Sequence, residues 1–183
     1  MYRAMAYYLI QNQVDAADQE AIAAACQHAD ISICYQDGEQ VVLLNGENVN
    51  AYLRTEAVGN MASVSSVVPE VRKKLVELQQ KLARETDVVM DGRDIGTVVL
   101  PDADVKVYLT ASVETRAKRR FLELQEKGES ADLAKIAADI EDRDYRDMHR
   151  DISPLRQAED ATLVDSSDMT IDQVVERILE LCR

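Results

Sequence analysis

The sequence predicts an α/β fold, a parallel sheet flanked by helices, with a small β-containing insertion. Three short apolar runs, at 88–90, 105–109 and 162–164, are separated by stretches of helical periodicity. Such runs are typical of strands that helices cover on both faces of a parallel sheet. A different pattern holds at 31–44, where apolar and polar side chains alternate around an Asp-Gly turn. This alternation predicts a small antiparallel unit.

The first third of the chain combines both patterns. Apolar residues recur at helical spacing at its start, and Asp15 is placed to cap a second helix through an alanine-rich stretch. An Asn-Gly pair after the second strand predicts another tight turn. The elements expected here are helices at 1–13, 15–28 and 51–66, and strands at 31–35, 41–44 and around residue 49.

The remaining elements are marked by residues that start and stop helices. Pro69 suits a first helical position, because its missing N–H would have no partner there. Gly128 separates two helices, and Thr170 with Gln173 predicts a capping box for the last one. The helices expected are at 69–85, 112–127, 131–150 and from 170 to the end of the chain.

Composition excludes several classes of function. The 183 residues carry a formal net charge of −13, which argues against a surface for duplex nucleic acid, since such a surface needs a basic stripe. The three cysteines show no CxxC or zinc-ligand spacing, and only two histidines are present. No apolar run reaches membrane-spanning length. We therefore expect a cytoplasmic protein with reduced thiols, no metal site of its own, and no nucleic-acid polymer or membrane as a partner.

The loop DGRDIGT, which follows the apolar run at 88–90, is the first candidate site. Ligands of open parallel sheets bind at the carboxyl ends of the strands. Arg93 can grip a phosphate through two N–H groups, and the flanking glycines let a ligand approach the backbone. Taken alone, this loop is also typical of a polar turn whose charges, including Asp94, face water.

The helical stretch EDRDYRDMHRD is the second candidate. Arg143, Asp147 and Arg150 fall on one helix face, so that two cations flank a carboxylate. Such a set suits a sugar phosphate, with cations for the phosphate and the carboxylate for hydroxyl groups. The alternative is a salt-bridge ladder on a solvated helix. Two further arginines, Arg119 and Arg120 in ETRAKRRF, are by themselves typical of a solvated face.

Four segments stand in an order that resembles bacterial cytidylate kinases, members of the nucleoside monophosphate kinase family. They are MYRA, RTEAVGNMASVSSVVPEVR, DGRDIGTVVLPDADVKVYLTAS and IEDRDYRDMHRDISPL. The resemblance covers essentially the whole chain. It implies transfer of the γ-phosphoryl group of ATP, with Mg²⁺, to CMP or dCMP by a protein that is monomeric when complete. A related kinase for another small acceptor is the alternative.

The resemblance also implies the roles of individual residues. For the base it implies Asp94 as acceptor of the cytosine amino group, Arg72 as donor, and Ser63 as a hydroxyl partner. Cytosine offers the complementary groups, whereas uracil does not. For the ribose, the resemblance implies contacts from Arg143 and Asp147. It implies that the acceptor phosphate is bound by Arg3, Arg93 and Arg150. The residues that it implies for ATP are Arg119 and Arg120. Arg93, Arg143 and Arg150 are the implied catalytic residues.

The same resemblance implies a division of the chain. It assigns 1–28 and 67–183 to the kinase core, with a lid near 112–150, and 29–66 to a nucleoside monophosphate-binding insertion. Nothing in 1–183 matches the phosphate loop GxxxxGK[ST], and no glycine precedes a lysine. We therefore expect a kinase-like core that lacks its first strand, phosphate loop and first helix. Such a chain should be nearly inactive as it stands. Either the native enzyme is longer, or this is a non-catalytic CMP-binding short form.

Overall fold

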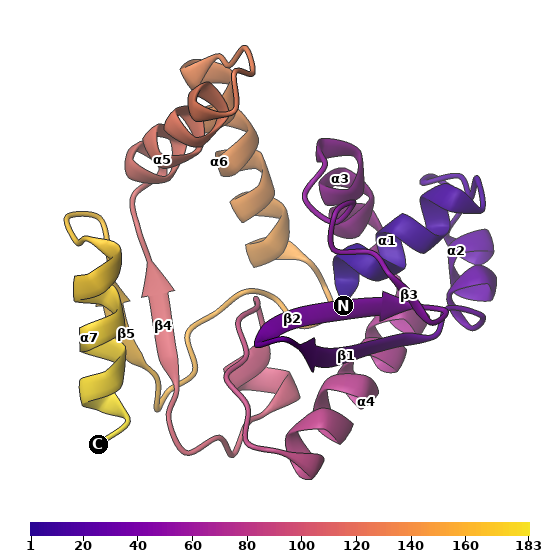
Figure 1. The fold of residues 1–183 in the computed structure, drawn as a ribbon, viewed down its shortest axis with the longest axis horizontal. Coiled ribbons are helices and arrows are strands. Elements are labelled where there is room, and N and C mark those ends of the chain that lie inside the picture. Colours follow the sequence, from indigo (N-terminus) through magenta and orange to yellow (C-terminus); the bar gives the residue numbers. More distant parts are fainter. The chain divides into compact units, whose positions relative to one another are not determined.

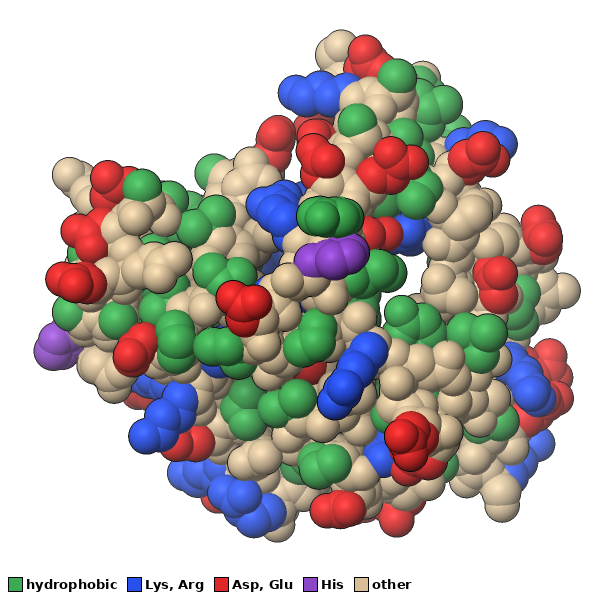
Figure 2. All heavy atoms as spheres, turned by 180° about the vertical axis from the view of Figure 1, so that it is seen from behind, with side chains coloured by type: hydrophobic (Ala, Val, Ile, Leu, Met, Phe, Trp, Pro, Cys, Tyr) green, Lys and Arg blue, Asp and Glu red, His purple; other side chains and the backbone are tan.

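A computed structural model describes all residues from 1 to 183, and the chain divides into an N-terminal unit, Met1–Val88, and a C-terminal unit, Val89–Arg183. Helices and strands of both units are shown in Figure 1. None of the helices is both long enough and apolar enough to cross a membrane. On the face displayed in Figure 2, acidic and basic side chains are interspersed.

Four helices build most of the N-terminal unit, and local capping explains their starts. Asp18 accepts a hydrogen bond from the N–H of Ala21, and Thr55 accepts one from the N–H of Val58. Pro69 occupies a first-turn position, as predicted. The helices are α1 (Tyr2–Gln11), α2 (Gln19–Cys26), α3 (Glu56–Ser65) and α4 (Pro69–Glu85).

The predicted antiparallel unit is confirmed as a three-stranded sheet in the order β1-β2-β3. Its strands are β1 (Ile31–Gln36), β2 (Glu39–Leu44) and β3 (Glu47–Asn48). Asp37 and Gly38 have φ values of 53° and 82°, and the Asn-Gly turn has 51° and 84°. Two successive positive φ values match the twist of the flanking strands, which explains why these dipeptides fix the hairpins.

One hydrophobic core joins this sheet to the helices. Fully buried Met5, Leu9, Ile22 and Leu75 pack in the same cluster as Leu44 from β2. Residues of the predicted insertion at 29–66 therefore share this core with α1, α2 and α4. The functional division into core, lid and insertion stays a prediction.

Two predicted helix starts in this unit are too early. Asp15 accepts from the N–H of Ala17 in a local turn, so the cap of α2 falls to Asp18 three residues later. The helix expected from residue 51 begins at Glu56, because turns occupy 50–54 and Thr55 supplies the capping oxygen. In both places a polar side chain nearer the helix takes the capping role.

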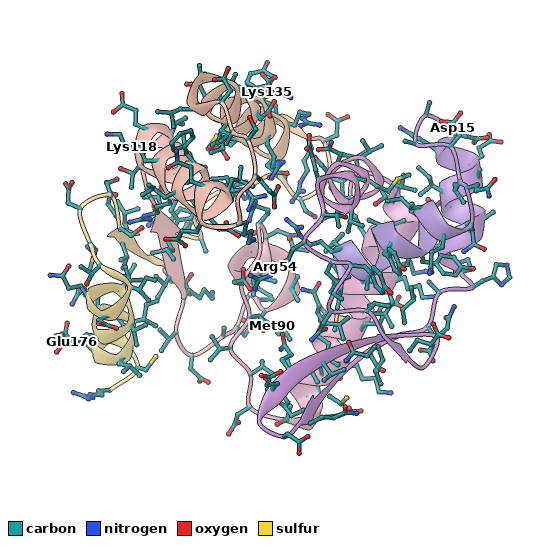
Figure 3. All side chains as sticks on the ribbon, turned by 45° about the horizontal axis from the view of Figure 1, so that its top comes forward. Asp15, Arg54, Met90, Lys118, Lys135 and Glu176 are labelled. Carbon is teal, nitrogen blue, oxygen red and sulfur yellow. The ribbon has the colours of Figure 1, made fainter.

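The C-terminal unit contains a parallel pair of strands and three helices. The pair β4 (Val107–Thr110) and β5 (Thr162–Asp165) confirms the predicted parallel pairing, with Val107 opposite Thr162. Helices α5 (Val113–Glu126) and α6 (Leu133–His149) form a hairpin, visible in Figure 1. Lys118 and Lys135 lie on its outer surface (Figure 3). The capping box of α7 (Ile171–Leu181) is present as predicted.

The strand predicted at 88–90 is wrong for this structure. The segment has no strand pairing, and the Val89 side chain is fully exposed. A strand exists only where a neighbour completes its ladder of backbone hydrogen bonds, and the parallel sheet here contains β4 and β5 alone. The predicted missing first strand stays untested. A π-helix at Ile95–Val99, which the sequence did not predict, follows the DGRD turn.

Candidate functional site

The turn before the π-helix fixes the position of Asp94. Its backbone carbonyl accepts from the N–H groups of Val98 at 2.9 Å and Val99 at 3.2 Å, and its side chain is almost fully buried. A Cβ at Gly92 would lie 2.9 Å from Cγ1 of Ile95, so any larger residue there would have to displace the Ile95 side chain. Isolated π-helical turns are rare and occur frequently at functional sites.

The end of α6 supplies two more of the predicted residues. Asp147 is buried on the last turns of the helix, and its carbonyl accepts from the N–H of Leu155 at 2.7 Å. Arg150 follows the helix end, where its Nε donates to the carbonyl of Ser153 at 2.7 Å. Ser153 has a φ of 51°, a strained value for a non-glycine residue, and this bend turns its carbonyl toward Arg150.

Four of the predicted side chains meet in an arginine–aspartate cluster, which consists of Arg93, Asp94, Asp147 and Arg150. Arg93 Nε donates to Asp147 Oδ2 at 3.0 Å. Arg150 Nη1 lies 3.5 Å from Asp147 Oδ1, and Arg150 Nη2 lies 4.0 Å from Asp94 Oδ1. Residues from two separate segments thus converge.

Burial distinguishes this cluster from a solvated salt-bridge ladder. The exposed fractions of the side chains are 6% for Arg150, 6% for Asp94 and 12% for Asp147, whereas Arg93 is 50% exposed. Buried charges are costly unless they are paired, and they are rarely retained for stability alone. Because Arg93 remains half exposed, the cluster is open to solvent on the side of that residue.

Arg143 lies one helical turn before Asp147. Its Nε is buried and has no hydrogen-bond partner. A buried N–H without a partner costs free energy and often marks a place where a ligand or water completes the pairing. This observation supports the predicted ligand-binding role of Arg143.

The predicted residues Arg3, Ser63 and Arg72 belong to the N-terminal unit. Arg3 Nη1 donates to the carbonyl of Leu53 at 2.7 Å. Arg72 is buried, donates from Nη1 to the Ser66 carbonyl at 3.2 Å, and has its guanidinium carbon 5.8 Å from the ring centroid of Tyr2. That distance is within range of a cation–π interaction.

Ser63 lies half-buried on α3, and its carbonyl accepts from the Ser66 hydroxyl at 2.8 Å. The N-terminal unit therefore holds Arg72 and Ser63 near the same helix end.

The two arginines predicted to bind ATP are engaged elsewhere in the C-terminal unit. Arg119 Nη2 donates to the carbonyls of Ser166 at 2.6 Å and Met169 at 3.2 Å, in the loop between β5 and α7. Arg120 pairs with Glu123 at 2.8 Å. Hydrogen bonds from Lys127 and then Arg120 lower the pKa of Glu123 from 4.5 to about 2.

Three residues with positioning contacts were missed in the sequence. Tyr2 faces Arg72, Ser66 accepts from Arg72, and Ser153 accepts from Arg150. Only Tyr2 carried a usable signal, as an aromatic residue inside the MYRA segment. Nothing in the sequence marks the carbonyl of a serine as an acceptor, or a positive φ in Ser-Pro.

No group of three or more His, Cys, Asp or Glu side chains in 1–183 is arranged to hold a metal ion. Mg²⁺ bound with a nucleotide takes few protein ligands and relies on phosphate oxygens.

An α/β fold with a largely buried set of arginines and carboxylates beside a tight turn is typical of proteins that bind phosphorylated ligands. The cytidylate kinase family model matches residues 1–183. The chain belongs to this family of nucleoside monophosphate kinases, which are transferases.

Curated relatives agree with the family match. The cytidylate kinase of Lactobacillus johnsonii is 50% identical over 181 residues, which cover 99% of this chain and 79% of the relative. The cytidylate kinase of Caldicellulosiruptor saccharolyticus is 47% identical over 99% of this chain and 80% of its own. The cytidylate kinase of Serratia proteamaculans is 44% identical over 98% of this chain and 78% of its own.

Proposed function

We propose that this protein transfers the γ-phosphoryl group of ATP to CMP or dCMP. The arginine–aspartate cluster is the observation that carries the proposal, because it brings Arg93 and Arg150 from separate segments to one carboxylate. Two guanidinium groups at one place suit the phosphate of a nucleotide, which they can hold through paired N–H donors.

The proposed base recognition uses complementary hydrogen bonding. The Asp94 carboxylate accepts from the N4 amino group of cytosine, and Arg72 donates to N3 and O2, with the Ser63 hydroxyl as a further partner. Uracil presents O4 and N3–H instead, so both charged groups would be mispaired. Each buried polar group left unpaired costs about 1–3 kcal/mol, which is enough to discriminate strongly.

The proposed sugar and phosphate contacts follow from the remaining residues. Asp147 accepts from ribose hydroxyls, and the buried Nε of Arg143 donates toward the sugar. Arg93, Arg150 and Arg3 hold the acceptor phosphate.

This arrangement suits phosphoryl transfer between nucleotides. The phosphate of CMP is already anionic at neutral pH, so its oxygen attacks the γ-phosphorus of ATP without a general base. The oxygen that bridges the β- and γ-phosphates then leaves with ADP. Positioning and charge neutralisation by the arginines supply most of the catalysis in such a reaction.

ATP with Mg²⁺ is the proposed phosphoryl donor, and Arg119 and Arg120 are the residues proposed to approach it. Both must leave their present partners, the 166–169 loop and Glu123, to do so. Residues 1–183 contain no phosphate-loop motif, whose backbone N–H groups and lysine would cradle the donor phosphates. We therefore expect residues 1–183 alone to bind CMP but to transfer phosphate slowly.

Calorimetric titration of residues 1–183 with CMP and with UMP tests the proposal. We expect CMP to bind at least about tenfold more tightly, since one mispaired buried group already costs that much. Asp94→Asn should remove most of this preference. Asp91→Asn, an exposed position in the same loop, is the matched control and should preserve it.

Equal affinity for CMP and UMP would refute the cytosine assignment and favour a related kinase with another small acceptor. Phosphoryl transfer is then measured with the protein purified from its source, whose intact mass is compared with the 20.5 kDa of this chain. CMP binding without any transfer by that protein would instead identify a non-catalytic CMP-binding form.

A further inference from the structure

Asp147 occupies the two arginines that are proposed to receive the acceptor phosphate. Its Oδ2 accepts from Arg93 Nε, and its Oδ1 faces Arg150 Nη1 at 3.5 Å. One carboxylate therefore bridges both guanidinium groups, with one oxygen directed to each.

A carboxylate and a phosphate compete for the same guanidinium edges. A carboxylate is planar and a phosphate is tetrahedral, but each presents a pair of anionic oxygens that accept two parallel N–H donors. Because Asp147 is buried and Arg150 is almost fully buried, their attraction is weakly screened by water and salt. An incoming anion must displace Asp147 before it can use these donors.

We propose that Asp147 is an internal competitor that excludes free phosphate from the site and yields to a phosphate attached to a sugar. Free phosphate that displaces Asp147 leaves a buried carboxylate without donors. A nucleoside monophosphate brings hydroxyl groups that donate to Asp147 as its phosphate takes the arginines. Binding then exchanges partners and leaves no charge unpaired. Phosphate recognition is in this way coupled to sugar recognition, and the site selects against inorganic phosphate.

This inference rests on the proposed function only in assigning the phosphate to Arg93 and Arg150. Its test uses inorganic phosphate as the probe, so the result does not depend on CMP binding or on catalysis. If CMP fails to bind, the proposed function fails, and the competition between Asp147 and phosphate is still decided by the experiment below.

The test compares phosphate binding by wild-type protein and Asp147→Asn, which retains the shape of the side chain and removes its charge. Affinity is obtained from the rise of Tm with phosphate concentration, because a ligand that binds only the folded state stabilises it by RT ln(1 + L/Kd), where L is the free ligand concentration. We expect phosphate to bind Asp147→Asn about tenfold more tightly, which corresponds to loss of one charge-assisted contact. CMP affinity should not rise with it.

Two controls separate competition from a general change of charge. Asp142→Asn removes the same charge from an exposed position of α6 and should leave phosphate affinity within about twofold of wild type. Adding Arg93→Gln to Asp147→Asn should abolish the gain in phosphate affinity, because Arg93 supplies some of the N–H donors that loss of the Asp147 charge makes available. Unchanged phosphate affinity in a folded Asp147→Asn protein would overturn the proposal, as would an equal gain in Asp142→Asn.

Discussion

Replacing Arg150 by lysine keeps the positive charge of the arginine–aspartate cluster and removes the guanidinium fork. Arg150 donates a hydrogen bond of normal length from Nε to the Ser153 carbonyl, at 2.7 Å. Its other nitrogens face Asp147 at 3.5 Å and Asp94 at 4.0 Å. An ammonium group has three donors, but they sit on one nitrogen and cannot reproduce the spacing of the guanidinium nitrogens.

The size of the effect follows from these contacts. Lysine retains attraction to the two carboxylates but loses the hydrogen bond that the charged Nε of Arg150 donates to Ser153. Such a bond contributes about 1.5–3 kcal/mol, and we expect Arg150→Lys to reduce the free energy of unfolding by about 2 kcal/mol. For a chain of this size, that loss lowers Tm by about 4–8 °C.

Urea and thermal unfolding measure this loss, and Arg146→Lys provides the control. Arg146 is exposed and donates only to the carbonyl of Asp142 at 3.3 Å, so its replacement should change stability by less than about 0.5 kcal/mol. If Arg150→Lys unfolds like the wild-type protein, the guanidinium fork does not hold the cluster together and our account of its geometry is wrong.

Three further predictions concern single positions. Leu75→Ala empties a fully buried site in the N-terminal core and should cost about 2–5 kcal/mol in urea unfolding, and a cost below about 1 kcal/mol would contradict the assigned packing. Thr170→Ala removes a capping-box oxygen and should cost about 1 kcal/mol, whereas Thr170→Ser should restore it. Lys127 and Arg120 lower the pKa of Glu123 to about 2. The contribution of the ionised Glu123 side chain to stability is therefore present above pH 4.5 and is lost as the pH falls toward 2. An NMR titration of Glu123 with a midpoint near 4.5 would refute this pairing.

Helix starts and tight turns that are set by the backbone chemistry of a local residue could be predicted from the sequence. Pro69 begins α4, Thr170 caps α7, and the Asp-Gly and Asn-Gly pairs form the turns of the antiparallel sheet. Each of these residues restricts φ or supplies a local hydrogen bond, so its effect needs no knowledge of the rest of the fold.

Features that depend on a distant partner were not predictable in the same way. The apolar run at 88–90 reads as a strand, yet a strand forms only beside another strand. Asp15 is as good a cap as Asp18, and the choice between them is made by the turn that Asp15 closes onto Ala17.

The candidate site shows the same limit. The loop position and the helical spacing marked Arg93 with Asp94, and Asp147 with Arg150, as two separate candidates; only the family resemblance placed them at one ligand, and the structure brings the four side chains together. The sharing of one carboxylate by two arginines depends on side-chain geometry that spacing does not describe. The Ser153 carbonyl that holds Arg150 depends on a strained backbone angle, for which the sequence offers no signal.

Because of the π-helix at Ile95–Val99, the orientation of the Asp94 side chain depends more on the number of residues in this segment than on the identity of their side chains. Its turn holds one residue more than an α-turn, because Val99 N–H reaches back five residues to the Asp94 carbonyl. Deleting one residue there would let the segment rewind as an ordinary helix and rotate everything before it by about 100°. Conservative substitutions at the half-buried positions 95–98 should therefore be tolerated, whereas single-residue deletions should yield folded proteins that no longer recognise their ligand. A scan of insertions and deletions would find the site here even where a scan of substitutions passes over it.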